Sequence, residues 1–107
     1  MVESPNQDRI SLLREMTAAD PEDGLGWQML GGELLRAGQY ADAAEALGQA
    51  ARLTPELAAI WKQLGDAQRK SGNSEQARAA YEQAISVAES TGDLQAAKEA
   101  RALLTKL

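Results

Sequence analysis

Two short stretches, Trp27–Gly31 (WQMLG) and Trp61–Gly65 (WKQLG), decide the fold of this chain. The tryptophans, leucines and glycines of the two stretches lie 34 residues apart. The same spacing relates further pairs: Pro21 and Pro55, Gly38 and Gly72, Ala43 and Ala77, Ala46 and Ala80, Gln49 and Gln83, and Ala50 and Ala84. An internal period of this length indicates stacked copies of one small structural unit.

The composition favours helices. Ala and Leu supply much of the 44% apolar content, while the β-branched residues that favour strands are scarce. Apolar residues recur at helical spacing and predict six helices, at about 6–18, 25–37, 40–53, 57–71, 74–89 and 93–106. We expect Gly38 to end the second helix as a left-handed cap, and Asn73 and Asp93 to cap the helices that follow them.

The two periods follow the pattern W-x2-L-G-x2-[large apolar] and, later, A-x3-[large apolar]. The residues that match are Trp27, Leu30, Gly31, Leu34, Ala43 and Leu47, and then Trp61, Leu64, Gly65, Ala77 and Tyr81. On these residues the chain resembles the tetratricopeptide repeat family over nearly its whole length. The resemblance implies an all-α fold, in which antiparallel helix–turn–helix repeats stack as a short right-handed α-solenoid of about six helices. Gln68 departs from the pattern where a large apolar residue is usual, and Glu89 where a proline is usual.

We predict a single domain over residues 1–107, with one core. It divides into an N-terminal half-repeat helix (6–18), repeat 1 (24–57), repeat 2 (58–91) and a C-terminal capping helix (93–106). Trp27 and Trp61 are expected to be largely buried, and Tyr40 and Tyr81 to pack with their hydroxyls in water. Met1 and the polar residues after it favour a natural start, but whether the chain is complete or part of a longer array stays open.

Composition excludes several functions. The chain has 11 Lys and Arg against 16 Asp and Glu, a net charge of -5, which disfavours nucleic acid as a partner. It has no His and no Cys, no glycine-rich phosphate loop and no carboxylate pair set apart from ordinary helix charges, so we predict no metal site, no cofactor and no enzymatic activity. No apolar run is long enough to cross a membrane and no signal peptide is recognisable, so a cytoplasmic location is expected.

The side of each first helix opposite the Trp-Leu-Gly stripe is the candidate binding surface. The resemblance implies that these positions line a concave groove that holds a peptide or a partner helix. The predicted groove residues are Leu25, Gln28, Gly32, Leu35 and Arg36, and then Lys62, Asp66, Arg69 and Lys70. Four cations against one carboxylate favour an acidic segment, although an ordinary solvated helix face can carry the same charges. Gly32 either deepens the floor of this groove or relieves crowding, and we favour relief.

The leading hypothesis is therefore a protein–protein interaction module that binds an acidic peptide or partner segment of unknown identity. The alternative is an assembly protein that forms homodimers through its end helices, where Leu12, Met16, Leu103 and Leu107 offer apolar surface.

Overall fold

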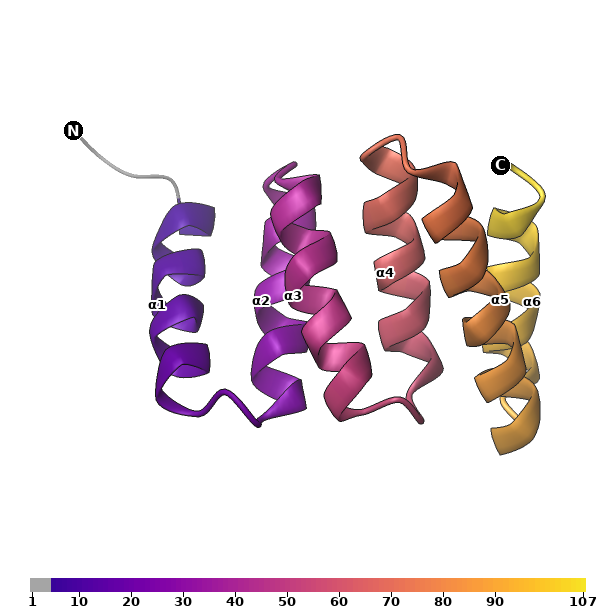
Figure 1. The fold of residues 1–107 in the computed structure, drawn as a ribbon, viewed down its shortest axis with the longest axis horizontal. Coiled ribbons are helices and arrows are strands. Elements are labelled where there is room, and N and C mark those ends of the chain that lie inside the picture. The colour runs from indigo at the N-terminus through magenta and orange to yellow at the C-terminus, as the bar shows by residue number, and fades with distance from the viewer. Residues whose placement is uncertain (1–4) are drawn as a thin grey trace.

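Six helices make up most of the chain in the computed structural model, which describes residues 5–107. They are α1 (Pro5–Ala19), α2 (Gly24–Arg36), α3 (Tyr40–Leu53), α4 (Ala58–Lys70), α5 (Ser74–Thr91) and α6 (Leu94–Leu104). Successive helices run antiparallel, side by side, along an elongated stack (Figure 1). The first four residues of the predicted domain 1–107 lie outside the described part.

The contacts between helices follow their order in the chain. Each helix packs against the next one, and α4 also contacts α2 on one side and α6 on the other. This is the arrangement of stacked helix pairs, so the predicted all-α fold is confirmed. The division into repeats at 24–57 and 58–91 stays a proposal that rests on the 34-residue period.

Three helices end at a glycine, where the sequence predicted a break. Gly38 and Gly72 have φ angles of 77° and 83°, a left-handed conformation that residues with a Cβ rarely adopt. The fifth helix continues through Thr91, beyond the predicted end at Glu89. It stops only at Gly92, because no proline interrupts it earlier and Gly92 is the first residue in the left-handed conformation.

One of the two predicted N-terminal caps makes a side-chain capping bond. The side chain of Asp93 accepts a hydrogen bond from the backbone nitrogen of Ala96 at 3.0 Å, as a capping residue does. Asn73 occupies the N-cap position of α5 as expected, but it makes no side-chain capping bond, because its amide instead donates to the Oε1 atom of Gln68 at 2.9 Å. Gln68, the departure from the repeat pattern, therefore makes a hydrogen bond at the α4–α5 turn.

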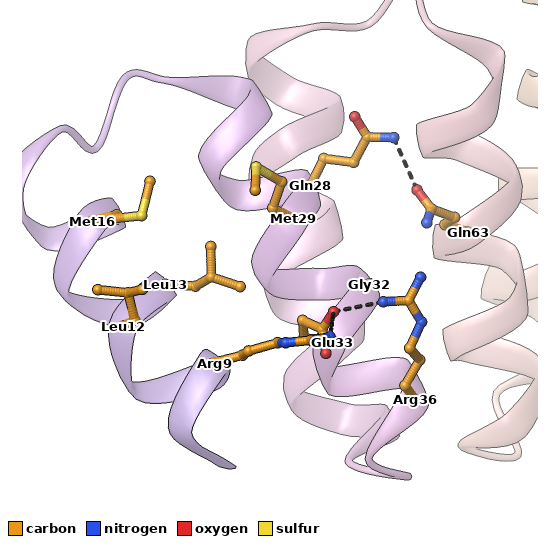
Figure 2. Close-up of a pocket in the computed structure, with 10 residues that line it drawn as sticks. All are labelled: Arg9, Leu12, Leu13, Met16, Gln28, Met29, Gly32, Glu33, Arg36 and Gln63. Atoms are coloured by element: carbon orange, nitrogen blue, oxygen red, sulfur yellow. Dashed lines mark hydrogen bonds and ion pairs between the residues drawn. The ribbon is translucent and has the colours of Figure 1, made fainter. Parts of the chain in front are cut away.

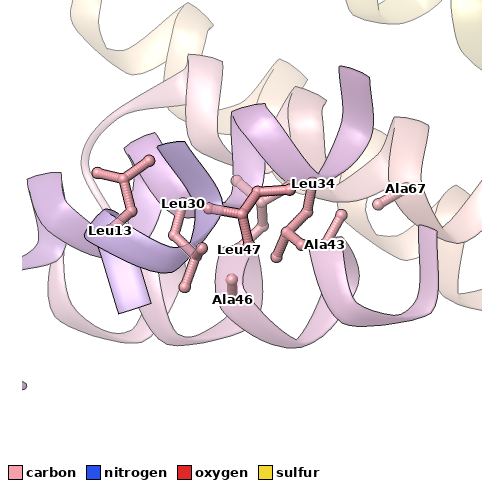
Figure 3. Packing of buried hydrophobic residues seen from close by; sticks show 8 residues of the cluster. Leu13, Leu30, Leu34, Ala43, Ala46, Leu47 and Ala67 are labelled. Carbon is pink, nitrogen blue, oxygen red and sulfur yellow. The ribbon is translucent and has the colours of Figure 1, made fainter. Parts of the chain in front are cut away.

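The core combines leucines and alanines from consecutive helices. One cluster of buried residues joins α1, α2, α3 and α4, and Figure 3 shows its packing. Its members are Ile10, Leu13, Leu30, Leu34, Ala43, Ala46, Leu47 and Ala67. The alanine side chains are small, so the helix backbones lie close together. The leucine side chains fill the space that remains between the helices.

Trp27 and Trp61, which we expected to be largely buried, pack against the core clusters and keep a minor part of their surface exposed. Each indole nitrogen donates a hydrogen bond, at 2.8 Å, to the carbonyl oxygen of the proline six residues earlier, Pro21 or Pro55. The indole edge is therefore held by the preceding turn, while part of the ring packs on the core and part stays exposed. The same hydrogen bond therefore recurs at the same position of each 34-residue period.

A glycine in the first helix of each pair faces a large side chain of the second helix. A Cβ at Gly65 would lie 2.5 Å from Cε1 of Tyr81, and a Cβ at Gly31 would overlap the side chain of Leu47. Gly48, also within a helix, differs because nothing lies within 4 Å of its would-be Cβ. The close contact of α4 with α5 and of α2 with α3 therefore depends on the first two glycines.

We expect Gly65→Ala to lower the free energy of unfolding by about 1–3 kcal/mol, because the added methyl group overpacks against a buried ring. The matched variant Gly48→Ala should raise it by about 0.5–1 kcal/mol, since alanine stabilises a helix interior that has space for it. Urea denaturation followed by circular dichroism measures both values. Equal effects of the two substitutions would contradict the close contact.

Candidate functional site

A hollow of about 540 Å³ opens between α1, α2 and α4; we name it the α1–α2 hollow (Figure 2). Its apolar lining includes Leu12 and Met16 of α1 and Met29 of α2, whose exposed fractions are 57%, 45% and 47%. These three side chains give the hollow an exposed apolar lining.

The polar edge of the α1–α2 hollow carries two arginines around one buried carboxylate. The Oε1 atom of Glu33 lies 2.5 Å from Arg36 Nη1 and 3.5 Å from Arg9 Nη1. Glu33 is 8% exposed, whereas the side chains of Arg9 and Arg36 are 63% and 69% exposed. The hollow therefore has a formal charge of +1, and both guanidinium groups remain accessible to a further carboxylate.

The floor of this hollow is formed by amides and a glycine. Gln28 Nε2 donates to Gln63 Oε1 at 3.1 Å and so connects α2 to α4. At Gly32, an added Cβ would meet nothing closer than Gln63 Nε2 at 3.7 Å. Helix crowding thus does not require a glycine at this position, contrary to our expectation. A side chain there would instead occupy part of the hollow.

A second hollow, of about 580 Å³, lies between α4 and α6; we name it the α4–α6 hollow. Its charged lining consists of three carboxylates, Glu56, Asp93 and Glu99, and one cation, Lys62. Gln63 lines both hollows, so they adjoin one another along α4. The two ends of this surface therefore carry formal charges of opposite sign.

The structure divides the predicted groove residues between several places. Gln28, Gly32 and Arg36 line the α1–α2 hollow, while Lys62 lines the α4–α6 hollow. Leu25 is exposed, and Leu35 is half-buried against the core.

The other three predicted residues line neither hollow and have partners of their own. Asp66 and Arg69 bind the hydroxyl of Tyr81. The ammonium group of Lys70 lies 5.6 Å from the centre of the Tyr40 ring, within the range of a cation–π contact. The four predicted cations therefore do not meet in one hollow.

Sequence reasoning missed Arg9, Met29 and Glu33 as residues of the hollow, and it missed the contribution of α6. In α1, the spacing of Arg9, Leu12 and Met16 could have placed them on one helix face. For α6, extending the 34-residue period would have brought Asp93 and Ala96 into register with Ala59 and Lys62.

Residues 34–107 match the sequence profile of the tetratricopeptide repeat family. A TPR repeat-containing protein of Pseudomonas aeruginosa, PA0015, is 38% identical over 95 residues, which cover 89% of this chain and 90% of that protein. The chain belongs to the tetratricopeptide repeat family.

Solved structures share the same fold. Protein BPP2914 of Bordetella parapertussis superposes with a TM-score of 0.76 at 27% identity, over 98% of this chain and 88% of that one. PcrH in complex with the chaperone binding region of PopD gives 0.87 at 17% identity, over 94% and 77%. The TPR2B domain of yeast Sti1, in a complex with pHsp70, gives 0.86 at 18% identity, over 94% and 81%.

A buried tyrosine, Tyr81, joins α4 and α5. The Tyr81 hydroxyl donates to Asp66 Oδ1 at 2.6 Å and accepts from Arg69 Nε at 3.1 Å. The predicted wet hydroxyl is therefore wrong for Tyr81, which is 0% exposed. Burial raises the pKa of Tyr81 to about 12, and its hydrogen bond to Asp66 acts in the same direction. Two predicted groove residues thus hold α4 to α5.

None of the described helices combines the length and the apolar character that crossing a bilayer requires. Within residues 5–107, no three His, Cys, Asp or Glu side chains are arranged to hold a metal ion.

The pKa of Tyr81 makes the stability of the repeat dependent on alkaline pH. Between about pH 10 and 12 the unfolded chain loses the phenol proton while the folded chain keeps it. This contribution is therefore complete below pH 10 and is lost as the pH rises towards 12. In Tyr81→Phe, we expect a smaller fall in the urea midpoint between about pH 9 and about pH 11 than in the wild type.

At neutral pH, Tyr81→Phe should lower the free energy of unfolding by about 0.5–1.5 kcal/mol through loss of the two hydrogen bonds. Tyr40→Phe is the control, since Tyr40 is half-buried and its ring rather than its hydroxyl contacts Lys70. The same alkaline fall in both variants would count against the role of Tyr81.

Proposed function

We propose that the protein is a protein–protein interaction module that binds a segment of a partner protein in the α1–α2 hollow. The observation that carries the proposal is the group of three exposed apolar side chains, Leu12, Met16 and Met29, beside two exposed arginines. Such a surface combines apolar area to bury with charged groups that orient the ligand.

The chemistry of the hollow favours a segment that carries both apolar side chains and a carboxylate. Apolar side chains would cover Leu12, Met16 and Met29, at about 25 cal/mol for each Å² removed from water. A carboxylate would lie near Arg9 and Arg36, which exceed Glu33 in formal charge. The acidic residue belongs at this end of the surface, because the three carboxylates of the α4–α6 hollow repel it from the other end.

Relatives in fold support the general role. PcrH and the TPR2B domain of Sti1 were each solved with part of another protein, PopD and pHsp70 respectively. The proposal includes no catalytic step, because the chain has no His or Cys and the Asp66–Tyr81–Arg69 group holds two helices together.

We expect Arg36→Gln to weaken the binding of an acidic peptide that carries Leu and Met by up to about fivefold, since exposed ion pairs contribute about 0–1 kcal/mol. The loss should shrink as salt is added. Titration of the isotope-labelled protein, followed by the backbone amide signals of Met29 and Gly32, measures the affinity and locates the peptide.

The matched control is Arg78→Gln, which removes the same charge from an exposed position of α5 outside the hollow. A peptide affinity that changes neither with salt nor with the Arg36 substitution would contradict the charge argument. Signals that move only at the α4–α6 hollow would contradict the proposed site.

Self-association is a second candidate, and the exposed face of α1 favours it. Among the described helices, the backbone of α1 lies close to that of α2 alone, and α1 leaves Leu12 and Met16 about half exposed. At the other end of the stack, Leu103 and Leu107 are half-buried and offer less surface.

If α1 forms the contact, Leu12→Glu should abolish a concentration-dependent rise in sedimentation coefficient, because a carboxylate cannot be buried unpaired in a symmetric interface. Leu94→Glu is the control, since Leu94 is 75% exposed at the opposite end of the stack. A wild-type sedimentation coefficient that does not change with protein concentration would exclude this candidate.

A further inference from the structure

A third hollow, of about 420 Å³, lies between α4 and α5; we name it the α4–α5 hollow. Its lining residues are Trp61, Leu64, Gln68, Gln76, Ala79, Ala80 and Gln83. On α4, Trp61, Leu64 and Gln68 share one helix face at spacings of three and four residues. Lys62 and Gln63, which line the other hollows, lie on the opposite side of the same helix.

The first repeat carries the same hollow in a smaller form, of about 170 Å³, between α2 and α3; we name it the α2–α3 hollow. The 34-residue period relates the two linings residue by residue. The matching pairs are Trp27 and Trp61, Leu30 and Leu64, Asp42 and Gln76, Glu45 and Ala79, and Ala46 and Ala80. The chain thus provides an internal comparison between two equivalent places in one fold.

An ion pair spans the smaller hollow and is missing from the larger one. Arg14 of α1 lines the α2–α3 hollow, and its Nη2 atom lies 3.7 Å from Asp42 Oδ2. One period later, Arg14 is replaced by Gly48 and Asp42 by Gln76. A Cβ at Gly48 would meet nothing within 4 Å, so a side chain could lie there without a clash. The residues at the equivalent positions of the larger hollow, Gly48 and Gln76, cannot form such a pair.

The residues of the α4–α5 hollow differ in charge from those of its counterpart. Arg14, Asp42 and Glu45 line the smaller hollow, whereas every residue that lines the larger one is uncharged. In a chain with 25% charged residues, this surface presents an indole, small apolar side chains and the amides of Gln68, Gln76 and Gln83. It cannot attract a ligand by charge.

An indole next to amides matches one class of peptide. A polyproline II helix offers flat apolar rings and backbone carbonyls that have no internal hydrogen bonds, and such segments dock in grooves lined by aromatic residues. Glutamine amides can donate to these carbonyls. The Trp61 indole nitrogen already donates to the carbonyl oxygen of Pro55, which holds the partly buried ring in place before any ligand arrives.

We propose that the α4–α5 hollow is a second docking site, for an uncharged, proline-rich segment in the polyproline II conformation. It lies on the other side of α4 from the α1–α2 hollow and selects for the opposite chemistry. The two sites can therefore be occupied at the same time, and the second does not depend on the function proposed for the first.

The test introduces an equivalent of the Arg14–Asp42 ion pair at the α4–α5 hollow, with the double variant Gly48→Arg and Gln76→Asp. The probe is an end-capped, proline-rich peptide without charged residues, titrated into the isotope-labelled protein. In the wild type, the indole signal of Trp61 and the side-chain amide signals of Gln76 and Gln83 should move saturably, while the indole signal of Trp27 stays in place. In the double variant, the affinity should fall at least tenfold without a loss of thermal stability.

Two controls separate the docking site from other causes. Gly48→Ala keeps the hollow open and should bind as the wild type does, and Arg36→Gln should leave the affinity for this probe unchanged. Wild-type affinity in the double variant would overturn the proposal, as would equal movement of the two indole signals. Saturable binding of an acidic peptide at Trp61, without binding of the proline-rich probe, would overturn the assigned chemistry.

Discussion

The contact between a glycine on one helix and a large side chain on the next is the interaction on which the structure depends. Gly31 receives Leu47, and Gly65 receives the ring of Tyr81, at positions where a Cβ would overlap the partner. Each contact joins the two helices of a pair and brings their backbones together closely. A single pair cannot bury its own apolar stripe, so the neighbouring helices α1 and α6 complete the stack.

Close packing on one face of each first helix leaves the other sides available for binding. On α2 and α4, the side that carries Gln28 and Gln63 opens into two adjoining hollows. On the other side, the partly buried Trp27 and Trp61 line two more hollows. The same repeat thus produces two kinds of surface, and substitutions between the repeats make them differ in charge and volume.

The electrostatic environment of each predicted groove cation depends on the side chains that the fold places around it. Lys62, Arg69 and Lys70 belong to the same predicted basic groove, yet each has different surroundings. Arg69 binds the Tyr81 hydroxyl, Lys70 lies over an aromatic ring, and Lys62 is next to carboxylates supplied largely by α6 and the turn before it. The net positive charge instead arises at the α1–α2 hollow, where Arg9 and Arg36 surround Glu33.

The sequence alone determined the helices, their order and the family, because helix formation and capping depend on residues close together in the chain and because the 34-residue period is visible without coordinates. Of the predicted groove residues, Gln28, Gly32 and Arg36 line the α1–α2 hollow, and their role in binding stays a proposal. Only the tertiary structure decided that Tyr81 binds Asp66 and Arg69. It also decided that Arg9 and Glu33 line the α1–α2 hollow and that Arg14 forms an ion pair with Asp42. These contacts join different helices, so they depend on distances between side chains that no pattern within one helix contains.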